Sequence, residues 1–212
     1  MKTLLLVISI LFSSSAFAII DSLDVDYPED TLPKKVIFGF QLGSNTSSFY
    51  SSQKPTKDNH IINGYGVRLG VQAEIFLGDY FSLAPKAELM FNNTQLWVRD
   101  DSDLLYESPI MPVSMQFMSH LHFKIPGEKW QPLMMIGPNY RLPVKSENLT
   151  QRAYGSRSDL GLDFGIGLER KFKYMTIAPE LRYTYGFKDI DKSPFIKSMY
   201  HHQIAFVVSI KG

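Results

Sequence analysis

The chain has 212 residues, with 22 Lys and Arg against 21 Asp and Glu, so its formal net charge is +1, and it contains no Cys. This balance of charge gives no support for nucleic-acid binding. The absence of Cys excludes disulfides, thiolate metal sites and a lipid-modified cysteine.

The N-terminal stretch MKTLLLVISILFSSSAFA, residues 1–18, has the pattern of a signal peptide. One Lys precedes an apolar run that is shorter than the ~20 residues a membrane-spanning helix needs. Ala16 and Ala18 are small residues of the kind that precede a signal-peptidase cleavage site. We therefore predict export with cleavage after Ala18, followed by a short acidic periplasmic lead-in over residues 19–34.

Eight later segments alternate apolar and polar residues with a period of two, as expected of strands with one apolar face. They lie near residues 36–46, 64–77, 81–92, 111–123, 132–142, 159–169, 175–186 and 202–210. Helical spacing fits none of these segments as well. The chain is therefore predicted to be all-β.

The connections between these segments alternate strictly between short and long. The long polar connections lie at roughly 47–63, 93–109, 143–158 and 187–201. This alternation is typical of an antiparallel up-and-down barrel in an outer membrane, with short periplasmic turns and long outer loops. Since eight strands leave interior room only for side chains, the apolar faces must point outward into lipid. We predict an eight-stranded transmembrane β-barrel over residues 35–212, located in the cell outer membrane.

Aromatic residues gather at both ends of the predicted strands, as in the two belts that mark membrane interfaces. The predicted girdle consists of Tyr80, Phe81, Trp130, Phe172 and Tyr174 at the short-turn end and Tyr65, Trp97, Tyr140, Tyr183 and Tyr185 toward the long-loop end.

The polar faces of the strands carry long charged side chains. Inside a barrel these must pair, because an isolated charge in a low-dielectric interior is costly. The predicted interior ionic network consists of Arg68, Glu74, Lys86, Glu88, Asp163, Glu169, Glu180 and Arg182. We expect a packed ionic core without an open pore.

The sixth and seventh segments allow a register to be predicted. A four-residue turn at 170–173 sets Asp163 opposite Glu180. Arg182 then lies diagonal to Asp163 and two residues from Glu180, so it is expected to bridge both carboxylates.

The second and third segments give a similar prediction from a three-residue turn at 78–80. The opposed pairs are then Gln72 with Lys86 and Gly70 with Glu88. Their diagonals are expected to bring Glu74 near Lys86 and Arg68 near Glu88.

Few residues have the pattern of a metal-binding or catalytic site. His120 and His122 share one strand face, a spacing that allows two-point metal binding, but no third ligand is evident and polar filling of the interior is the alternative. Ser119 precedes His120 directly and faces the other side, unlike the His-x-Ser pair of outer-membrane lipid A deacylases. No phosphate-binding loop or nucleophile elbow is present. We predict no enzyme activity, no catalytic residues, no metal site and no cofactor.

Four segments of the sequence resemble the PorT-like outer-membrane β-barrel family of the Bacteroidetes. They are FGFQLGSNTSSF (38–49), LGDYFSLAPKAELMF (77–91), PIMPVSMQF with QPLMMIGPNYRL (109–117 and 131–142), and DLGLDFGIGLERKFKYMTIAPELRYTYGFKDI (159–190). The resemblance implies an outer-membrane barrel and an accessory role in type IX protein secretion. One departure is the end of the chain, Ile210-Lys211-Gly212, where such barrels often carry an aromatic residue.

Three functional hypotheses follow. The first is a PorT-like secretion accessory that docks other envelope or secretion-machinery proteins. The second is a structural or adhesive barrel of the OmpA/OmpX kind, whose long loops 47–63 and 143–158 bind surface ligands. The third is a narrow channel or an enzyme. In each case outer membrane lipid is the expected partner of the barrel wall.

Overall fold

A computed structural model describes residues 36–51, 59–99, 105–144, 157–190 and 198–212. The predicted signal peptide (1–18) and lead-in (19–34) lie outside these ranges. The described residues contain the strands β1 (Val36–Ser51), β2 (Asn59–Ile62), β3 (Gly64–Phe76), β4 (Phe81–Asn92), β5 (Gln95–Arg99), β6 (Leu105–Pro109), β7 (Val113–Lys124), β8 (Gln131–Pro143), β9 (Asp159–Lys171), β10 (Thr176–Gly186) and β11 (Met199–Lys211).

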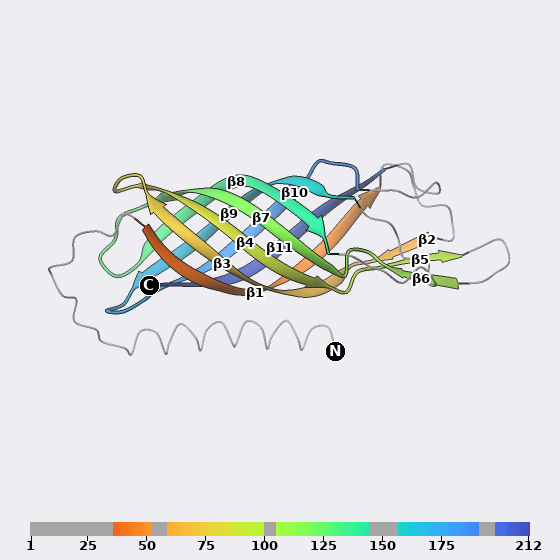
Figure 1. Ribbon diagram of the computed structural model, residues 1–212, viewed down its shortest axis with the longest axis horizontal. Helices are drawn as coiled ribbons and strands as arrows, with labels where there is room; N and C mark the ends of the chain where they lie inside the picture. The colour runs from red at the N-terminus through yellow and green to blue at the C-terminus, as the bar shows by residue number, and fades with distance from the viewer. Residues whose placement is uncertain (1–35, 52–58, 100–104, 145–156, 191–197) are drawn as a thin grey trace. The chain divides into compact units, whose positions relative to one another are not determined.

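Eight of the strands form a closed barrel in the order β1-β11-β10-β9-β8-β7-β4-β3 (Figure 1). Every neighbouring pair is antiparallel, and β1 closes the barrel by pairing with both β3 and β11. The chain thus runs up and down around the barrel. The predicted all-β, eight-stranded antiparallel barrel is confirmed.

The period-two pattern separates the two faces of each barrel strand. Apolar side chains on β1, such as Phe38 and Phe40, are 69% and 72% exposed on the outer wall, whereas the intervening Gln41 is 3% exposed inside. The ordinary arrangement of a water-soluble protein is therefore inverted. Among the described residues, no helix is long and apolar enough to cross a membrane.

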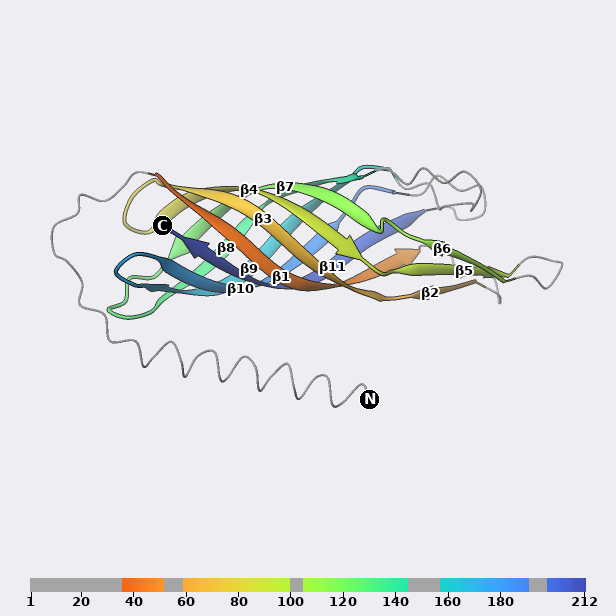
Figure 2. The ribbon, with the colours of Figure 1, turned by 60° about the horizontal axis from the view of Figure 1, so that its bottom comes forward.

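Three further strands were not predicted. β2, β5 and β6 form a separate three-stranded sheet with the order β2-β5-β6, beyond one end of the barrel in Figure 2. They occupy parts of 47–63 and 93–109, which the sequence analysis treated as polar loops. The reason is that these strands are only four or five residues long and the connections are polar on average.

The predicted register between the sixth and seventh segments is wrong. Asp163 lies opposite Thr184, and Arg182 lies opposite Gly165. The turn has the predicted four residues but comes two residues later, because β9 continues through Lys171. The predicted turn began at Arg170, whose guanidinium is instead held over two aromatic rings on the strand's outer side.

The start of β7 also differs from the prediction. Met111, predicted to begin the outward face of the fourth segment, is 2% exposed. Its φ of 45° lies in the left-handed region, and Pro112 follows it. Because this conformation interrupts the extended chain, the alternation of β7 does not extend back to Met111.

Candidate functional site

Twelve buried charged side chains of the described residues point into the barrel. Six are cations and six are carboxylates, so with neutral histidines the lumen has no net charge from these groups. They are Arg68, Lys86, Lys124, Arg141, Arg182 and Lys211, with Glu74, Glu88, Asp159, Asp163, Glu169 and Glu180. Arg170 is also buried but lies on the outer side of β9, by alternation from inward Glu169.

Four charges form a ring at the short-turn end of the lumen, called here the basal ring: Glu74, Lys124, Glu169 and Lys211. The Lys124 ammonium lies 2.6 Å from Glu74 and 3.0 Å from Glu169. The Lys211 ammonium lies 2.7 Å and 2.5 Å from the same two carboxylates. The four residues come from alternate strands, β3, β7, β9 and β11. Charges of opposite sign therefore alternate around the lumen in one layer.

Five charges continue along the lumen as the central chain: Lys86, Glu180, Arg182, Glu88 and Arg68. Glu180 accepts from Lys86 at 3.0 Å and from Arg182 at 2.6 Å. Arg182 also contacts Glu88 at 2.5 Å, and Glu88 pairs with Arg68 at 3.1 Å. Arg182 on β10 and Glu88 on β4 lie on opposite sides of the barrel. The chain therefore links the two walls directly.

Two smaller groups involve His120 and Arg141. The His120 Nε2 lies 2.8 Å from Asp163, which also accepts from Asn139 at 3.0 Å. Arg141 pairs with Asp159 at 3.1 Å. These contacts give every cation and carboxylate of the lumen an oppositely charged or hydrogen-bonding neighbour, which offsets their loss of hydration.

The loop end of the lumen is closed differently. Five buried residues pack together there as the apolar cap: Phe49, Ile110, Met111, Ile190 and Met199. The Phe49 ring stacks on the imidazole of His201 with centroids 4.5 Å apart. Ile190 donates its backbone N–H to the carbonyl of Met199 at 3.0 Å. At this end of the lumen, the described residues thus form an apolar cluster next to His201 and not a ring of charges.

Some of the predicted contacts between charged residues are present in the structure, and others are not. The register between β3 and β4 is as predicted, and Arg68 contacts Glu88. The expected contact of Arg182 with Asp163 is wrong, because the later turn places Arg182 between Glu180 and Glu88.

The expected pairing of Glu74 with Lys86 is also wrong. Lys86 reaches across the lumen to Glu180, and Glu74 joins the basal ring, where Glu169 also lies. Thus all eight predicted network residues are buried, but they divide between different groups.

Four charged lumen residues were missed: Lys124, Arg141, Asp159 and Lys211. Lys124 and Lys211 each lie one residue beyond the end of a predicted segment. Arg141 lies within the predicted segment 132–142 but was given no partner, and Asp159 is the first residue of β9. Extending the alternation of each strand by one residue would have identified the two lysines as inward-facing.

The family is decided by a sequence profile described as "Outer membrane protein beta-barrel domain", which matches residues 28–192. The chain belongs to this family. It is thus a small β-barrel protein of the cell outer membrane. A comparison with curated proteins gives no match.

Three solved structures are among those similar to this outer membrane protein. Neisserial surface protein A has 12% identity and a TM-score of 0.48, with coverage of 82% of this chain and 97% of that one. OprG from Pseudomonas aeruginosa has 14% identity and a TM-score of 0.49, with coverage of 83% and 91%. Ail of Yersinia pestis, in complex with the heparin analogue sucrose octasulfate, has 12% identity and a TM-score of 0.43, with coverage of 84% and 100%. We draw no function from these similarities.

The predicted girdle residues are found at both ends of the outer membrane barrel. Tyr80, Phe81 and Tyr174 are exposed at the short-turn end, where Trp130 and Phe172 are half-buried. Toward the loop end, the exposed girdle residues are Tyr65, Tyr140, Tyr183 and Tyr185. Trp97 is the exception, since it lies on β5 of the separate sheet and not on a barrel strand.

His120 and His122, the two histidines considered for metal binding, have protein partners. His122 Nδ1 lies 3.4 Å from Glu74, and the His120 and His122 rings are 6.3 Å apart. Within the described ranges, no group of three or more His, Asp or Glu side chains is arranged to hold a metal ion. The hydrogen bonds to Glu74 and Asp163 give both histidines a structural role in the lumen.

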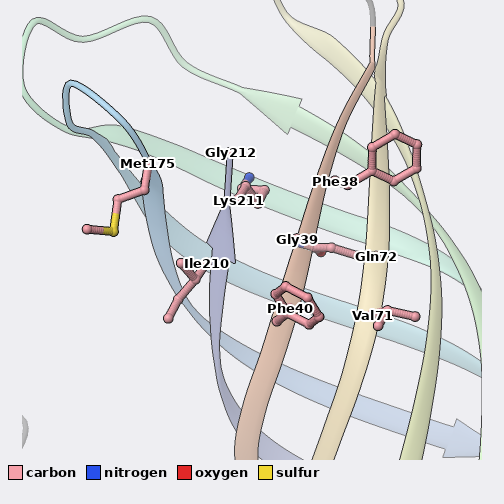
Figure 3. A pocket seen from close by; sticks show the side chains of 9 residues that line it. All are labelled: Phe38, Gly39, Phe40, Val71, Gln72, Met175, Ile210, Lys211 and Gly212. Carbon is pink, nitrogen blue, oxygen red and sulfur yellow. The ribbon is translucent and has the colours of Figure 1, made fainter.

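A shallow groove lies where β1 and β11 meet near the short-turn end (Figure 3). Most of its lining is apolar side chains of the outer wall, and Gln72, Lys211 and Gly212 also take part. The apolar residues are Phe38, Phe40, Val71, Met175 and Ile210. Gly39, between the two phenylalanines, contributes no side chain. Since the apolar lining belongs to the lipid-facing wall, we assign the groove to membrane contact and not to a polar substrate.

Proposed function

We propose that this outer membrane protein is a docking protein, in which the barrel is the anchor and the sheet β2-β5-β6 contacts another protein. The filled lumen supports this role, because the basal ring and the central chain occupy the space that a substrate would need. A docking role needs no catalytic step, in keeping with the expectation that the protein is not an enzyme.

The observation that carries the proposal is that three barrel strands continue beyond the barrel. β2 leads into β3 through one residue, β4 leads into β5, and β6 leads into β7. Hydrogen bonds from Asn93 N–H to Tyr65 at 3.2 Å and from Ile110 N–H to Thr94 at 2.9 Å connect the two ladders. The sheet is therefore continuous with three barrel strands and hydrogen-bonded to the chain at the end of the barrel.

β2 and β6 are the two outer strands of the separate sheet. Within the described ranges, β2 and β6 each pair only with β5. An unpaired edge offers backbone N–H and C=O groups to an extended segment of another protein. With short turns on the periplasmic side, this sheet lies on the cell exterior.

Photo-cross-linking in intact cells tests this role. A photoreactive residue at Ser108 on β6 should give a discrete protein adduct, because the described part of the chain pairs with β6 on one side only, through β5. The same group at Lys188, on the loop side of β10, is the matched control. Absence of an adduct at Ser108, or equal adducts at both positions, would contradict docking through the sheet.

The resemblance to the PorT-like family supports a finer proposal, that the partner belongs to the type IX secretion machinery. Deletion of the gene should then reduce the secretion of cargo into the medium. Normal secretion would refute this assignment while leaving a docking role intact. The adhesive alternative would then be favoured, in which residues 47–63 and 143–158 bind surface ligands. Most of 143–158 lies outside the described residues.

We also propose that residues 1–18 are removed on export and that 19–34 precede the barrel in the periplasm. N-terminal sequencing of the protein from outer membranes should then begin at Ile19. Recovery of Met1 in the membrane-inserted form would contradict cleavage.

A further inference from the structure

One sector of the short-turn end combines cations with aromatic rings on the outside of the barrel. It is built by the β7–β8 connection and the β9–β10 turn, which adjoin because β8 pairs with β9. We call its members the basal patch: Lys129, Trp130, Arg170, Lys171, Phe172, Lys173 and Tyr174. The patch lies at the membrane interface and is separate from the ionic groups of the lumen.

Arg170 is the structural centre of this patch. It faces the lipid side of β9 and yet is only 7% exposed. Its guanidinium carbon lies 5.0 Å from the centroid of Trp130 and 5.2 Å from that of Phe172. An outward arginine near lipid is stabilised by two aromatic faces in this way. The two rings thus hold the guanidinium at the membrane interface. An arginine without these contacts would extend its side chain into water.

The remaining cations surround this centre. Lys129, Lys171 and Lys173 are exposed, and the Lys173 ammonium lies 5.5 Å from the Tyr174 ring. The exposed carboxylate on these two connections is Glu128. With Arg170, the described residues of these two connections and the adjoining end of β9 thus carry four cations and one exposed carboxylate on the outer side.

The β3–β4 turn shows that this charge is local. Its residues 77–80, Leu-Gly-Asp-Tyr, include an acid and no cation. Exposed Tyr80 supplies the interfacial aromatic there without any neighbouring positive charge on the turn. The excess of cations is therefore found at the β7–β8 and β9–β10 connections and not at the β3–β4 turn.

We propose that the basal patch binds the phosphate headgroup of an anionic phospholipid in the periplasmic leaflet. Trp130, Phe172 and Tyr174 contact the upper acyl chains and glycerol region, as interfacial aromatics do. The cations attract the headgroup, and clustered Lys and Arg next to a membrane favour anionic lipids. A lipid fits better than a soluble anion because the same residues present an apolar and a cationic part side by side.

Tryptophan fluorescence can test this site because the chain has two Trp residues. The Trp97→Phe variant leaves Trp130 as the reporter within the patch. The full-length mature protein is inserted into phosphatidylcholine vesicles that contain a small fraction of lipid with brominated chains. The bromine atoms quench only a nearby tryptophan. Brominated phosphatidylglycerol and brominated phosphatidylcholine are compared at equal mole fraction.

The ratio of the affinities of the patch for the two lipids is obtained from the quenching of Trp130. At low ionic strength, we expect this ratio to favour phosphatidylglycerol by about tenfold. Each cation removed should lower this preference by about fivefold at most. Arg170→Gln with Lys173→Gln should bring the preference close to one. Lys188→Gln, at the other end of the barrel, should leave it unchanged. Equal quenching by both lipids in Trp97→Phe would overturn the proposal.

Two further arms distinguish the alternatives. Inorganic phosphate should lower the preference no more than sodium chloride of equal ionic strength does, because both salts screen the charges. If phosphate abolishes the preference and chloride does not, the patch is a site for free phosphate and the lipid proposal fails. Heat-modifiable gel migration shows whether each variant is folded. If the double variant does not fold, Lys173→Gln alone should lower the preference without changing migration, and an unchanged preference would count against the site.

Discussion

The two ends of the lumen are closed by opposite kinds of side chain. At the short-turn end, the basal ring closes the tube with four charges from alternate strands. At the loop end, the apolar cap closes it with residues such as Phe49 and Met199, which are 7% and 0% exposed. β11 contributes to both sets, with Lys211 at one end and Met199 at the other.

The difference shows what each closure must do. In the membrane-spanning part, apolar side chains are used on the lipid face, and long polar side chains fill the lumen and neutralise one another. At the loop end, apolar side chains pack against one another and against the ring of His201 instead. The comparison predicts that a broken charge chain destabilises the barrel more than a damaged cap.

The largest effect is expected for Arg182→Met. It leaves Glu180 and Glu88 without the cation that joins them across the lumen. We expect a loss of about 3–5 kcal/mol in the free energy of unfolding. The free energy of unfolding is measured by urea denaturation in lipid vesicles, with tryptophan fluorescence and gel migration as the two signals. Arg157→Met, at an exposed arginine, should change stability by about 0.5 kcal/mol or less. Equal effects of the two variants would contradict the role of the central chain.

Damage to the apolar cap should come next. Phe49→Ala removes the ring that stacks on His201, and a loss of about 3 kcal/mol is expected for a buried phenylalanine. Tyr50→Ala, at the adjacent side chain that is 65% exposed, is the matched control and should cost much less.

The same cap variant tests whether the cap or the charges block the lumen. Phe49→Ala in a planar bilayer should show no conductance above that of the empty bilayer, because the basal ring still fills the other end. Stable channel events would show that the cap, and not the ionic lumen, excludes ions.

Lys211→Met should have a smaller effect, since Lys124 still contacts Glu74 and Glu169 after the change. Loss of hydrogen bonds to two carboxylates is expected to cost about 1.5–3 kcal/mol. Adding Glu169→Gln should recover part of this loss, because one unpaired charge is removed. A double variant as unstable as the sum of the single ones would indicate that the ring is not energetically coupled.

The smallest effect is expected on the outer wall. The Tyr183 hydroxyl lies 3.1 Å from Nδ1 of His202 at an exposed site. Tyr183→Phe should therefore lower stability by about 0.5 kcal/mol or less under the same unfolding conditions. A loss comparable to that of Arg182→Met would show that the wall, and not the lumen, dominates stability.

The amino-acid sequence by itself determined the barrel. Strict alternation recurs eight times, and eight apolar faces cannot fit inside so narrow a tube, so the inverted arrangement of faces follows from volume alone. The register of β3 against β4 could also be predicted, because a three-residue turn leaves little freedom. The short β2, β5 and β6 could not, since four or five residues carry too little pattern.

Only the tertiary structure decided which charges meet. Sequence reasoning pairs neighbouring strands, and it found Arg68 with Glu88 in this way. The contacts of Arg182 with Glu88 and of Lys86 with Glu180 cross the lumen between strands that are not neighbours. Such contacts depend on the stagger of all eight strands at closure. The sequence therefore determined which residues form the ionic interior, and the closed barrel determined how they pair.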